Sequence, residues 1–270
     1  MFYQSIRIQI AIITKLINNT KFKIDKGDHL LDTHTHILWN IDDGSKNQCM
    51  SLQMLEIAAR SGTKAIFATP HVIERANKPS WEEIKEKTQQ LRQLCAEAQI
   101  DIMLYPGAEV QMNWELLPEL GATGAYCLNG GRYLLIELPA AEIPAYADEF
   151  WYELELKAIT PILAHPERYQ QLRENPDLLL LWRRRGMLMQ CNSGSFTGMF
   201  GSSVCENAKV LLANGLVDLL GSDGHRSEGR NTDMSRAAAV IRQLAGEEVL
   251  RQLTETNPQA ILKNQEIELK

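Results

Sequence analysis

The segment from residue 30 to residue 36 reads Leu-Leu-Asp-Thr-His-Thr-His, and it constrains this chain more than any other stretch. In a β-strand, side chains two positions apart point to the same face. We therefore expect His34 and His36 to point the same way from the end of a buried strand, where both can bind one metal ion. A His-x-His pair also arises by chance, so this interpretation depends on the other histidines and carboxylates.

Six more short apolar runs follow along the chain, and five of them end in a histidine or a carboxylate. Hydrophobic packing gives no reason for such endings, so their joint occurrence predicts a shared site, although each residue alone has an ordinary structural explanation. The run at 187–191 ends instead at Asn192, Ser193 and Gly194, a pattern that indicates only a strand-to-loop turn. The side chains at the other run ends are His71, Glu109, Glu137, His165, Asp223 and His225.

The apolar runs alternate with segments that carry helix signals, such as the capping box that begins at Ser80 and the Asn175-Pro176 start. This alternation predicts an α/β fold with parallel strands. An open doubly wound sheet does not gather seven strand ends around one point, whereas a closed barrel does. We therefore expect a distorted TIM-like barrel with seven parallel strands.

A length of 270 residues suits a single α/β domain, which we expect over residues 29–270. Residues 1–28 form an N-terminal extension that contains the isoleucine-rich stretch 2–17. That stretch is too short to span a bilayer and Lys15 interrupts it, and no signal-peptide cleavage site stands out. An added helix or strand packed on the domain is favoured, while a membrane-surface helix and an over-extended start codon are the alternatives.

Composition and motif searches exclude several classes of protein. The formal charge of −6 and the lack of a basic stripe argue against a nucleic-acid binder. The five cysteines are scattered and have no C-x-x-C spacing, which fits free thiols in a reducing cytoplasm. The chain has no phosphate-binding G-x-x-x-x-G-K-[ST] loop and no G-x-S-x-G elbow. None of its cysteines is followed by an arginine after five intervening residues, the spacing of a cysteine phosphatase; Cys127 and Arg132 are one residue short of it. Nitrogen and carboxylate ligands without thiolates suit Zn²⁺, Mn²⁺ or Fe²⁺.

Seven motifs together resemble one family, the PHP-domain protein-tyrosine phosphatases of bacterial capsule and exopolysaccharide clusters, of the CpsB/CapC/YwqE type. The resemblance runs from about residue 30 to residue 262, and the extension before it is the departure from the family pattern. The matching motifs lie at residues 32–38, 41–44, 68–71, 107–109, 136–137, 164–169 and 222–225.

The resemblance implies a seven-stranded PHP barrel that holds three divalent metal ions. Manganese is the usual assignment in such proteins, with iron, zinc, magnesium and cobalt as alternatives. By the motifs, one ion takes His34, His36, Glu109 and Asp223. The second takes Glu109 as a bridge, with Glu137 and His165, and the third takes Asp43, His71 and His225. The resemblance also implies that Arg168 and Arg230 clamp the phosphate, and Asp43, His71 and His225 are candidates for the general acid.

The implied activity is that of a manganese-dependent phosphomonoester hydrolase, a protein-tyrosine phosphatase acting on a bacterial tyrosine kinase of polysaccharide export. A homo-oligomer is expected, with membrane contact only through the kinase. Two alternatives remain open. One is a small-molecule phosphatase of the histidinol-phosphate type, and the other is a non-catalytic module that binds and regulates the kinase.

Overall fold

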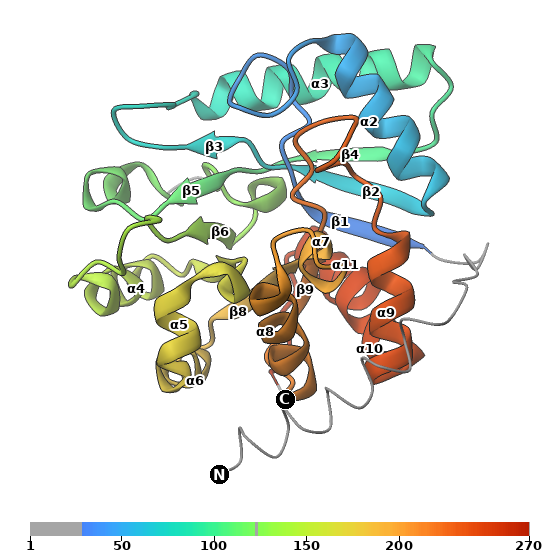
Figure 1. Ribbon diagram of the computed structural model, residues 1–270. Helices are drawn as coiled ribbons and strands as arrows, with labels where there is room; N and C mark the ends of the chain where they lie inside the picture. Colours follow the sequence, from blue (N-terminus) through green and yellow to red (C-terminus); the bar gives the residue numbers. More distant parts are fainter. Residues whose placement is uncertain (1–28, 122–123, 270) are drawn as a thin grey trace.

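The computed structural model describes residues 29–121 and 124–269 of the chain (Figure 1). The predicted extension at residues 1–28 lies outside the described residues. Short strands alternate with helices along the described chain, which confirms the expected α/β class. The strands are β1 Leu30–Thr35, β2 Thr63–Ala68, β3 His71–Val72, β4 Met103–Pro106, β5 Glu109–Gln111, β6 Tyr133–Glu137, β7 Thr160–Ala164, β8 Leu188–Asn192 and β9 Leu219–Gly221.

All strand pairs are parallel, and the strands form two sheets with the orders β1-β2-β4 and β3-β5-β6-β7-β8-β9. The described residues thus contain nine strands in two sheets, and not the expected seven strands in one. The difference arises where two of the predicted runs are interrupted, at Pro70 and at Gly107. Proline has no backbone N–H to donate to a neighbouring strand. Backbone hydrogen bonds from Gly107 to Ala68 and from Glu109 to Pro70 nevertheless continue the pairing between these two runs, at 2.9 and 3.0 Å.

The first strand lies beside the segment that follows the last one. The amide of Asp223 donates to the carbonyl of His34 at 2.7 Å, and the amide of His36 donates to the carbonyl of Gly224 at 2.9 Å. The parallel sheet is therefore curled, and the carboxyl ends of its strands face one region of the molecule (Figure 1). This geometry brings together side chains that are far apart in the sequence.

Helices cover the outside of the curled sheet (Figure 1). The predicted cap at Ser80 is confirmed, because its Oγ accepts a hydrogen bond from the amide of Glu83 at 3.1 Å. The turn expected at Asn192–Gly194 is wrong in detail, since β8 extends to Asn192 and a one-turn helix follows directly. The helices are α2 Gln48–Arg60, α3 Trp81–Glu97, α4 Ala147–Leu156, α5 Gln170–Glu174, α6 Pro176–Arg184, α7 Ser193–Phe196, α8 Ser202–Ala213, α9 Ser235–Ala245, α10 Glu247–Arg251 and α11 Asn257–Leu262, with the short turns η1 Trp114–Glu119, η2 Leu128–Gly130, η3 Pro166–Arg168 and η4 Gln252–Thr256.

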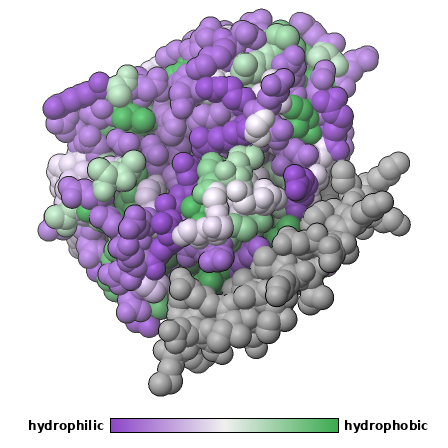
Figure 2. All heavy atoms as spheres, viewed as in Figure 1, coloured by the Kyte–Doolittle hydropathy of each residue, from purple (hydrophilic) through white to green (hydrophobic). Residues whose placement is uncertain are grey.

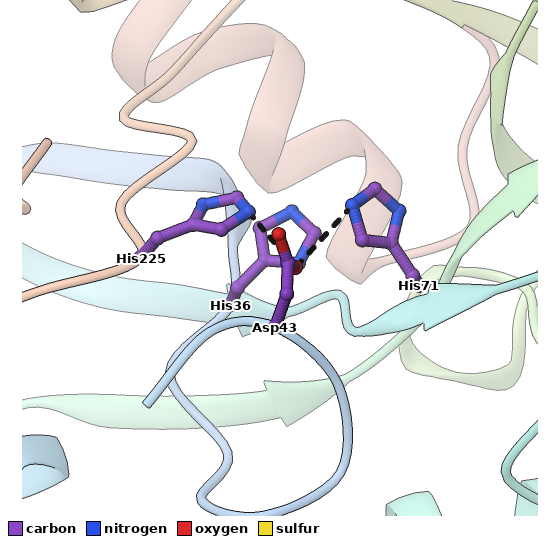
Figure 3. A group of neighbouring side chains, drawn as sticks. All are labelled: His36, Asp43, His71 and His225. Atoms are coloured by element: carbon purple, nitrogen blue, oxygen red, sulfur yellow. Dashed lines mark ion pairs between the residues drawn. The ribbon is translucent and has the colours of Figure 1, made fainter. Parts of the chain in front are cut away.

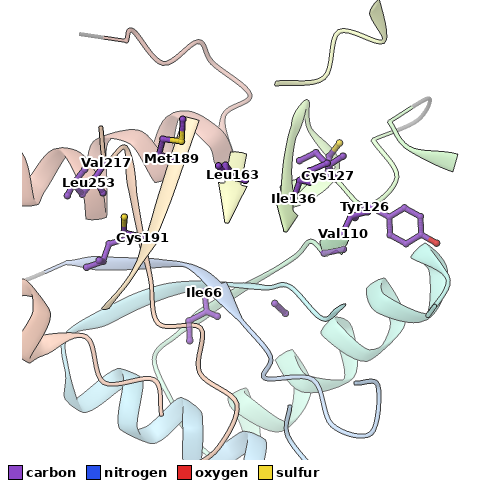
Figure 4. Packing of buried hydrophobic residues seen from close by; sticks show 14 of the residues in the cluster. Ile66, Val110, Tyr126, Cys127, Ile136, Leu163, Met189, Cys191, Val217 and Leu253 are labelled. Atoms are coloured by element: carbon purple, nitrogen blue, oxygen red, sulfur yellow. The ribbon is translucent and has the colours of Figure 1, made fainter. Parts of the chain in front are cut away.

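Buried apolar side chains form two clusters, one between the sheet and the helices and one enclosed by the sheet. Alternate residues of β6 divide between them: Leu134 and Ile136 join the helix-side cluster, and Tyr133 and Leu135 join the other. Figure 4 shows part of the helix-side cluster. Burial on both faces explains why the strands read as continuous apolar runs. Each buried leucine contributes about 1.5 to 3 kcal/mol, so this packing holds the strand ends rigidly in place.

On the face shown in Figure 2, hydrophilic residues predominate and apolar residues form small, separate groups. Among the described helices, none has both the length and the apolar composition that a membrane span requires.

Candidate metal centre

The structure brings together all nine residues that were predicted as metal ligands, in the region where β1, β6, β7 and β9 end and β3 and β5 begin. His34 lies in β1, and His36 is the first residue after that strand. The remaining ligand candidates come from β3, β5, the end of β6, and the segments after β1, β7 and β9; they are His71, Glu109, Glu137, Asp43, His165, Asp223 and His225. Convergence of this kind is what parallel strands with ligands at their ends produce.

Glu109 is the centre of the cluster, and its side chain is fully buried. Its Oε2 atom lies 3.1 Å from His34 Nε2, 3.2 Å from His36 Nε2 and 3.1 Å from His71 Nδ1. Its Oε1 atom lies 2.8 Å from His165 Nε2. Four imidazoles from three segments of the chain therefore surround one carboxylate, which suits a ligand shared between cations.

A second group of ligand atoms lies towards the mouth of the site (Figure 3). Asp43 Oδ1 is 3.3 Å from His225 Nε2 and 3.7 Å from His71 Nε2. His36 contributes to the same group, since the four side chains each offer a ligand atom and these atoms all lie within 4.8 Å of one another. Two further groups meet the same criterion: His34 with His36 and Asp223, and His71 with Glu109 and Glu137.

The residues present fit bound metal ions, because several buried polar atoms have no hydrogen-bond partner among the described residues. Buried polar groups normally find such partners. In addition, His34 Nε2 and His36 Nε2 face each other at 3.1 Å. Two nitrogens that each bind one ion at about 2.1 Å lie about 3.0 to 3.4 Å apart, so this pair matches two ligands of one ion. The atoms without a partner are His71 Nδ1, Glu109 Oε2, His165 Nδ1, Asp223 Oδ1 and His225 Nε2.

The charges in the cluster also suit cations. Burial alone would raise the pKa of Glu109, but the imidazoles of His34 and His71 hold that pKa well below its usual range. Burial likewise opposes ionisation of Asp223, whose pKa is nevertheless held low, chiefly by His34. Burial and the neighbouring His36 lower the pKa of His225 to about 4. Glu109 and Asp223 are thus charged and His225 is neutral at neutral pH, which are the protonation states that bind metal ions. Burial opposes protonation of His34 and His71, but Glu109 raises the pKa of both imidazoles, so a bound cation would replace protons that these rings otherwise hold.

Two of the ligand candidates have unusual backbone conformations. His165 and Asp223 have φ angles of +38° and +51°, in the left-handed region that residues with a side chain seldom adopt. Such conformations cost about 1 to 3 kcal/mol each and concentrate at functional sites. Here they turn the side chains that follow β7 and β9 back towards Glu109.

The two predicted phosphate-binding arginines lie at the mouth of the same site. Arg168 Nη1 is 3.2 Å from Asp223 Oδ2, and Arg230 pairs with the same oxygen. Both guanidinium groups also lie over the ring of Phe200, at 4.7 and 5.6 Å from its centroid. Both arginines line a cavity of about 660 Å³ together with His71 and other residues of the cluster. The sequence interpretation did not include Phe200, since no local signal marks it.

Asp42 and Tyr169 also contribute to the site, through hydrogen bonds to or beside ligand residues. Asp42 forms a turn, accepting from the amide of Gly44 at 2.8 Å, and its Oδ2 lies 2.7 Å from His36 Nδ1. The hydroxyl of Tyr169 accepts from the amide of Leu138, next to Glu137, at 2.9 Å. Partners of this kind fix the orientation of ligand side chains.

The comparison with known protein families identifies this arrangement. Residues 30–263 match the family model for CpsB/CapC, described as capsular polysaccharide synthesis. The chain belongs to the CpsB/CapC family. It is 34% identical over 238 residues to the tyrosine-protein phosphatase YwqE of Bacillus subtilis, which covers 88% of this chain and 93% of the relative. It is 28% identical to the tyrosine-protein phosphatase CpsB of Streptococcus pneumoniae, over 87% of this chain and 99% of the relative.

Solved structures give the same family. A structure from a study of YwqE and of CpsB from Streptococcus pneumoniae, described as unique metal-dependent tyrosine phosphatases, superposes with a TM-score of 0.84 at 33% identity. The match covers 89% of this chain and 97% of that one. A histidinol phosphate phosphatase from Lactococcus lactis matches with a TM-score of 0.53 at 15% identity, covering 81% of this chain and 94% of that one, which shows a shared fold alone.

Proposed function

We propose that this protein is a metal-dependent protein-tyrosine phosphatase. The observation that carries the proposal is the buried ring of imidazoles around Glu109, with two arginines directly beside it at the cavity mouth. The ring suits divalent cations, and the arginines suit a phosphate group. Membership of a family whose relatives are named tyrosine-protein phosphatases supports the same activity.

In this proposal the centre binds three divalent ions, manganese first among the candidate metals. His34, His36, Glu109 and Asp223 would hold one, and Glu109, Glu137 and His165 the second. Asp43, His71 and His225 would hold the third, where His36 also lies within reach. Such ions would lower the pKa of a bound water and neutralise charge on the phosphoryl oxygens.

The chain's own residues would then bind the ester and direct its cleavage. A guanidinium fork matches two phosphate oxygens, so Arg168 and Arg230 would orient the phosphoryl group from the mouth of the cavity. Both guanidinium carbons lie over the ring of Phe200, a cation–π contact that would help to hold the two arginines in position. Asp43 Oδ1 and His225 Nε2 lie 3.3 Å apart on the lining of the same cavity. The pKa values of both side chains are lowered, Asp43 by its hydrogen bond to His225 and His225 by burial, so both would be without a proton at neutral pH, which suits ligands of the third ion better than a general acid.

We further propose the physiological setting that the family resemblance implies. The substrate would be a phosphotyrosine protein, such as a tyrosine kinase of polysaccharide export, and the phosphatase would be cytoplasmic, reaching the membrane only through that partner. Residues 29–270 would form one domain and assemble into a homo-oligomer. If β2 and β3 are counted as one interrupted strand, and β4 and β5 as another, the nine strands would correspond to the seven strands of a PHP barrel.

The test compares two substrates on one preparation. The purified protein is stripped with a chelator and reloaded with Mn²⁺, and phosphate release is measured from a phosphotyrosine peptide and from histidinol phosphate. We expect preference for the peptide, lost on stripping and regained on reloading. Preference for histidinol phosphate would assign the site to a small-molecule phosphatase. Turnover of neither substrate would contradict the proposal and favour a binding module.

A further inference from the structure

Strand β8 contributes no side chain to the proposed ligand set, yet it places two fully buried amides beside it. Gln190 and Asn192 are two positions apart, and both have no exposed surface. We infer that they form an amide relay, defined as Gln190 and Asn192 together, that positions the ligand atoms of His34 and Asp223. The inference rests on the proposed function, because it assigns the relay a role in metal binding.

The hydrogen bonds of Gln190 fix the orientation of its amide. Nε2 donates to Asn192 Oδ1 at 3.0 Å and to the carbonyl of Cys191 at 2.8 Å. Both partners are acceptors, so the nitrogen must face them and Oε1 must face His34 Nδ1, which is 2.9 Å away. The proton of His34 therefore sits on Nδ1. Its other nitrogen, Nε2, faces Glu109 and Asp223 and would direct its lone pair at a cation bound between them, as a metal ligand requires.

The hydrogen bonds of Asn192 likewise fix the orientation of its side-chain amide. Its Oδ1 accepts from Gln190, so its Nδ2 donates to Asp223 Oδ2 at 2.6 Å. The other oxygen of that carboxylate, Oδ1, has no hydrogen bond and lies 3.5 Å from His34 Nε2 and 3.4 Å from His36 Nε2. Arg168 and Arg230 pair with the same Oδ2 atom, so the relay acts together with these arginines to leave free the oxygen of Asp223 that faces the imidazoles.

The surroundings hold the relay in place. The buried carboxylate of Glu167 accepts from the backbone N–H of Asn192 at 2.9 Å and from Ser195 Oγ at 2.6 Å. On the other side, a Cβ at Gly221 would lie 2.5 Å from His34 Cβ and 2.8 Å from Gln190 Nε2. Glycine at that position leaves the space in which the glutamine meets the imidazole.

The test measures metal affinity in single and double variants. Gln190→Met and Asn192→Leu keep approximate size and remove the hydrogen bonds. Manganese dissociation constants are measured by competition with a chelator, and bound metal is counted by elemental analysis. For each single variant, we expect the manganese dissociation constant at the affected site to be about 10- to 100-fold higher than in the wild type. Loss of either amide interrupts the relay. The double variant should therefore bind manganese about as weakly as the weaker-binding single variant, whereas two independent effects would multiply the fold-changes in the dissociation constant.

A matched control separates positioning from general damage to the core. Asn257 is another buried amide, and its Nδ2 donates to the carbonyl of Asp218 at 2.9 Å, without any hydrogen bond to the metal centre. Asn257→Ala should lower the melting temperature of the metal-free protein and leave manganese affinity unchanged. If Gln190→Met does not fold, Gln190→Glu serves instead. It keeps an acceptor for His34 but loses both donors, and it should show the same loss of affinity.

The outcomes distinguish the relay from the proposed function. Wild-type protein that binds manganese, together with relay variants that bind it equally well, would overturn the relay alone. An equal loss of affinity in the Asn257 control would also overturn it. Wild-type protein that binds no manganese would overturn the proposed function and, with it, the role of the relay.

Discussion

Replacement of Glu109 by glutamine is the perturbation for which the structure gives the clearest magnitude. The side chain is fully buried and lies within 3.2 Å of four imidazole nitrogens, and the proposed assignment shares it between two ions. At a manganese concentration 100 times the dissociation constant, each bound ion adds about 2.7 kcal/mol to the free energy of unfolding. Loss of two ions should therefore remove about 5 kcal/mol, or about 10 to 20 °C of melting temperature.

The assay is thermal unfolding followed by circular dichroism, in chelator and in manganese, for the wild type and Glu109→Gln. We expect manganese to raise the melting temperature of the wild type strongly and that of the variant by much less. Glu115→Gln is the matched control, because Glu115 is about half exposed and pairs with Arg75 on the surface. A full manganese-dependent rise in Glu109→Gln would refute the reasoning that this carboxylate is shared between ions.

Three further predictions concern single side chains. Arg168→Lys keeps the charge but loses the planar fork, so kcat/KM for a phosphotyrosine peptide should fall about 10- to 100-fold at unchanged metal content; wild-type kinetics would exclude a phosphate clamp. Tyr169→Phe leaves the amide of Leu138 without its acceptor and should cost about 1 to 3 kcal/mol in urea unfolding, and an unchanged midpoint would contradict this. Burial raises the pKa of Cys127 to about 12, so this thiol should resist Ellman's reagent at pH 8 while the exposed Cys49 reacts. Its contribution to stability is present below the unfolded pKa of about 8.5 and lost as pH rises towards 12, so unfolding should become easier with increasing alkalinity.

The ligand residues could be brought together from the sequence because their signals are local. The two-residue spacing of His34 and His36 specifies a common face, and the parallel arrangement brings each strand's carboxyl end to one region. The number of strands was harder to predict from the sequence. Pro70 and Gly107 divide two runs that the apolar pattern presents as continuous, because the spacing of apolar residues does not show where the regular strand geometry is interrupted.

The residues that the sequence did not reveal act through contacts between distant positions. Gln190 lies 156 positions from His34, and no spacing rule connects an amide in an apolar run to an imidazole in another. Phe200 likewise meets both arginines only after folding. The short helix α7, of four residues, is too brief to show a helical period, which is why a turn was expected there.

The central claim is that the side chains around Glu109 hold a cluster of divalent ions, and anomalous diffraction at the manganese edge tests it most directly. Crystals of the manganese-loaded protein should give three anomalous peaks. Two should share Glu109, and the third should lie among Asp43, His71 and His225. The absence of any peak in bonding distance of the Glu109 carboxylate would contradict the account.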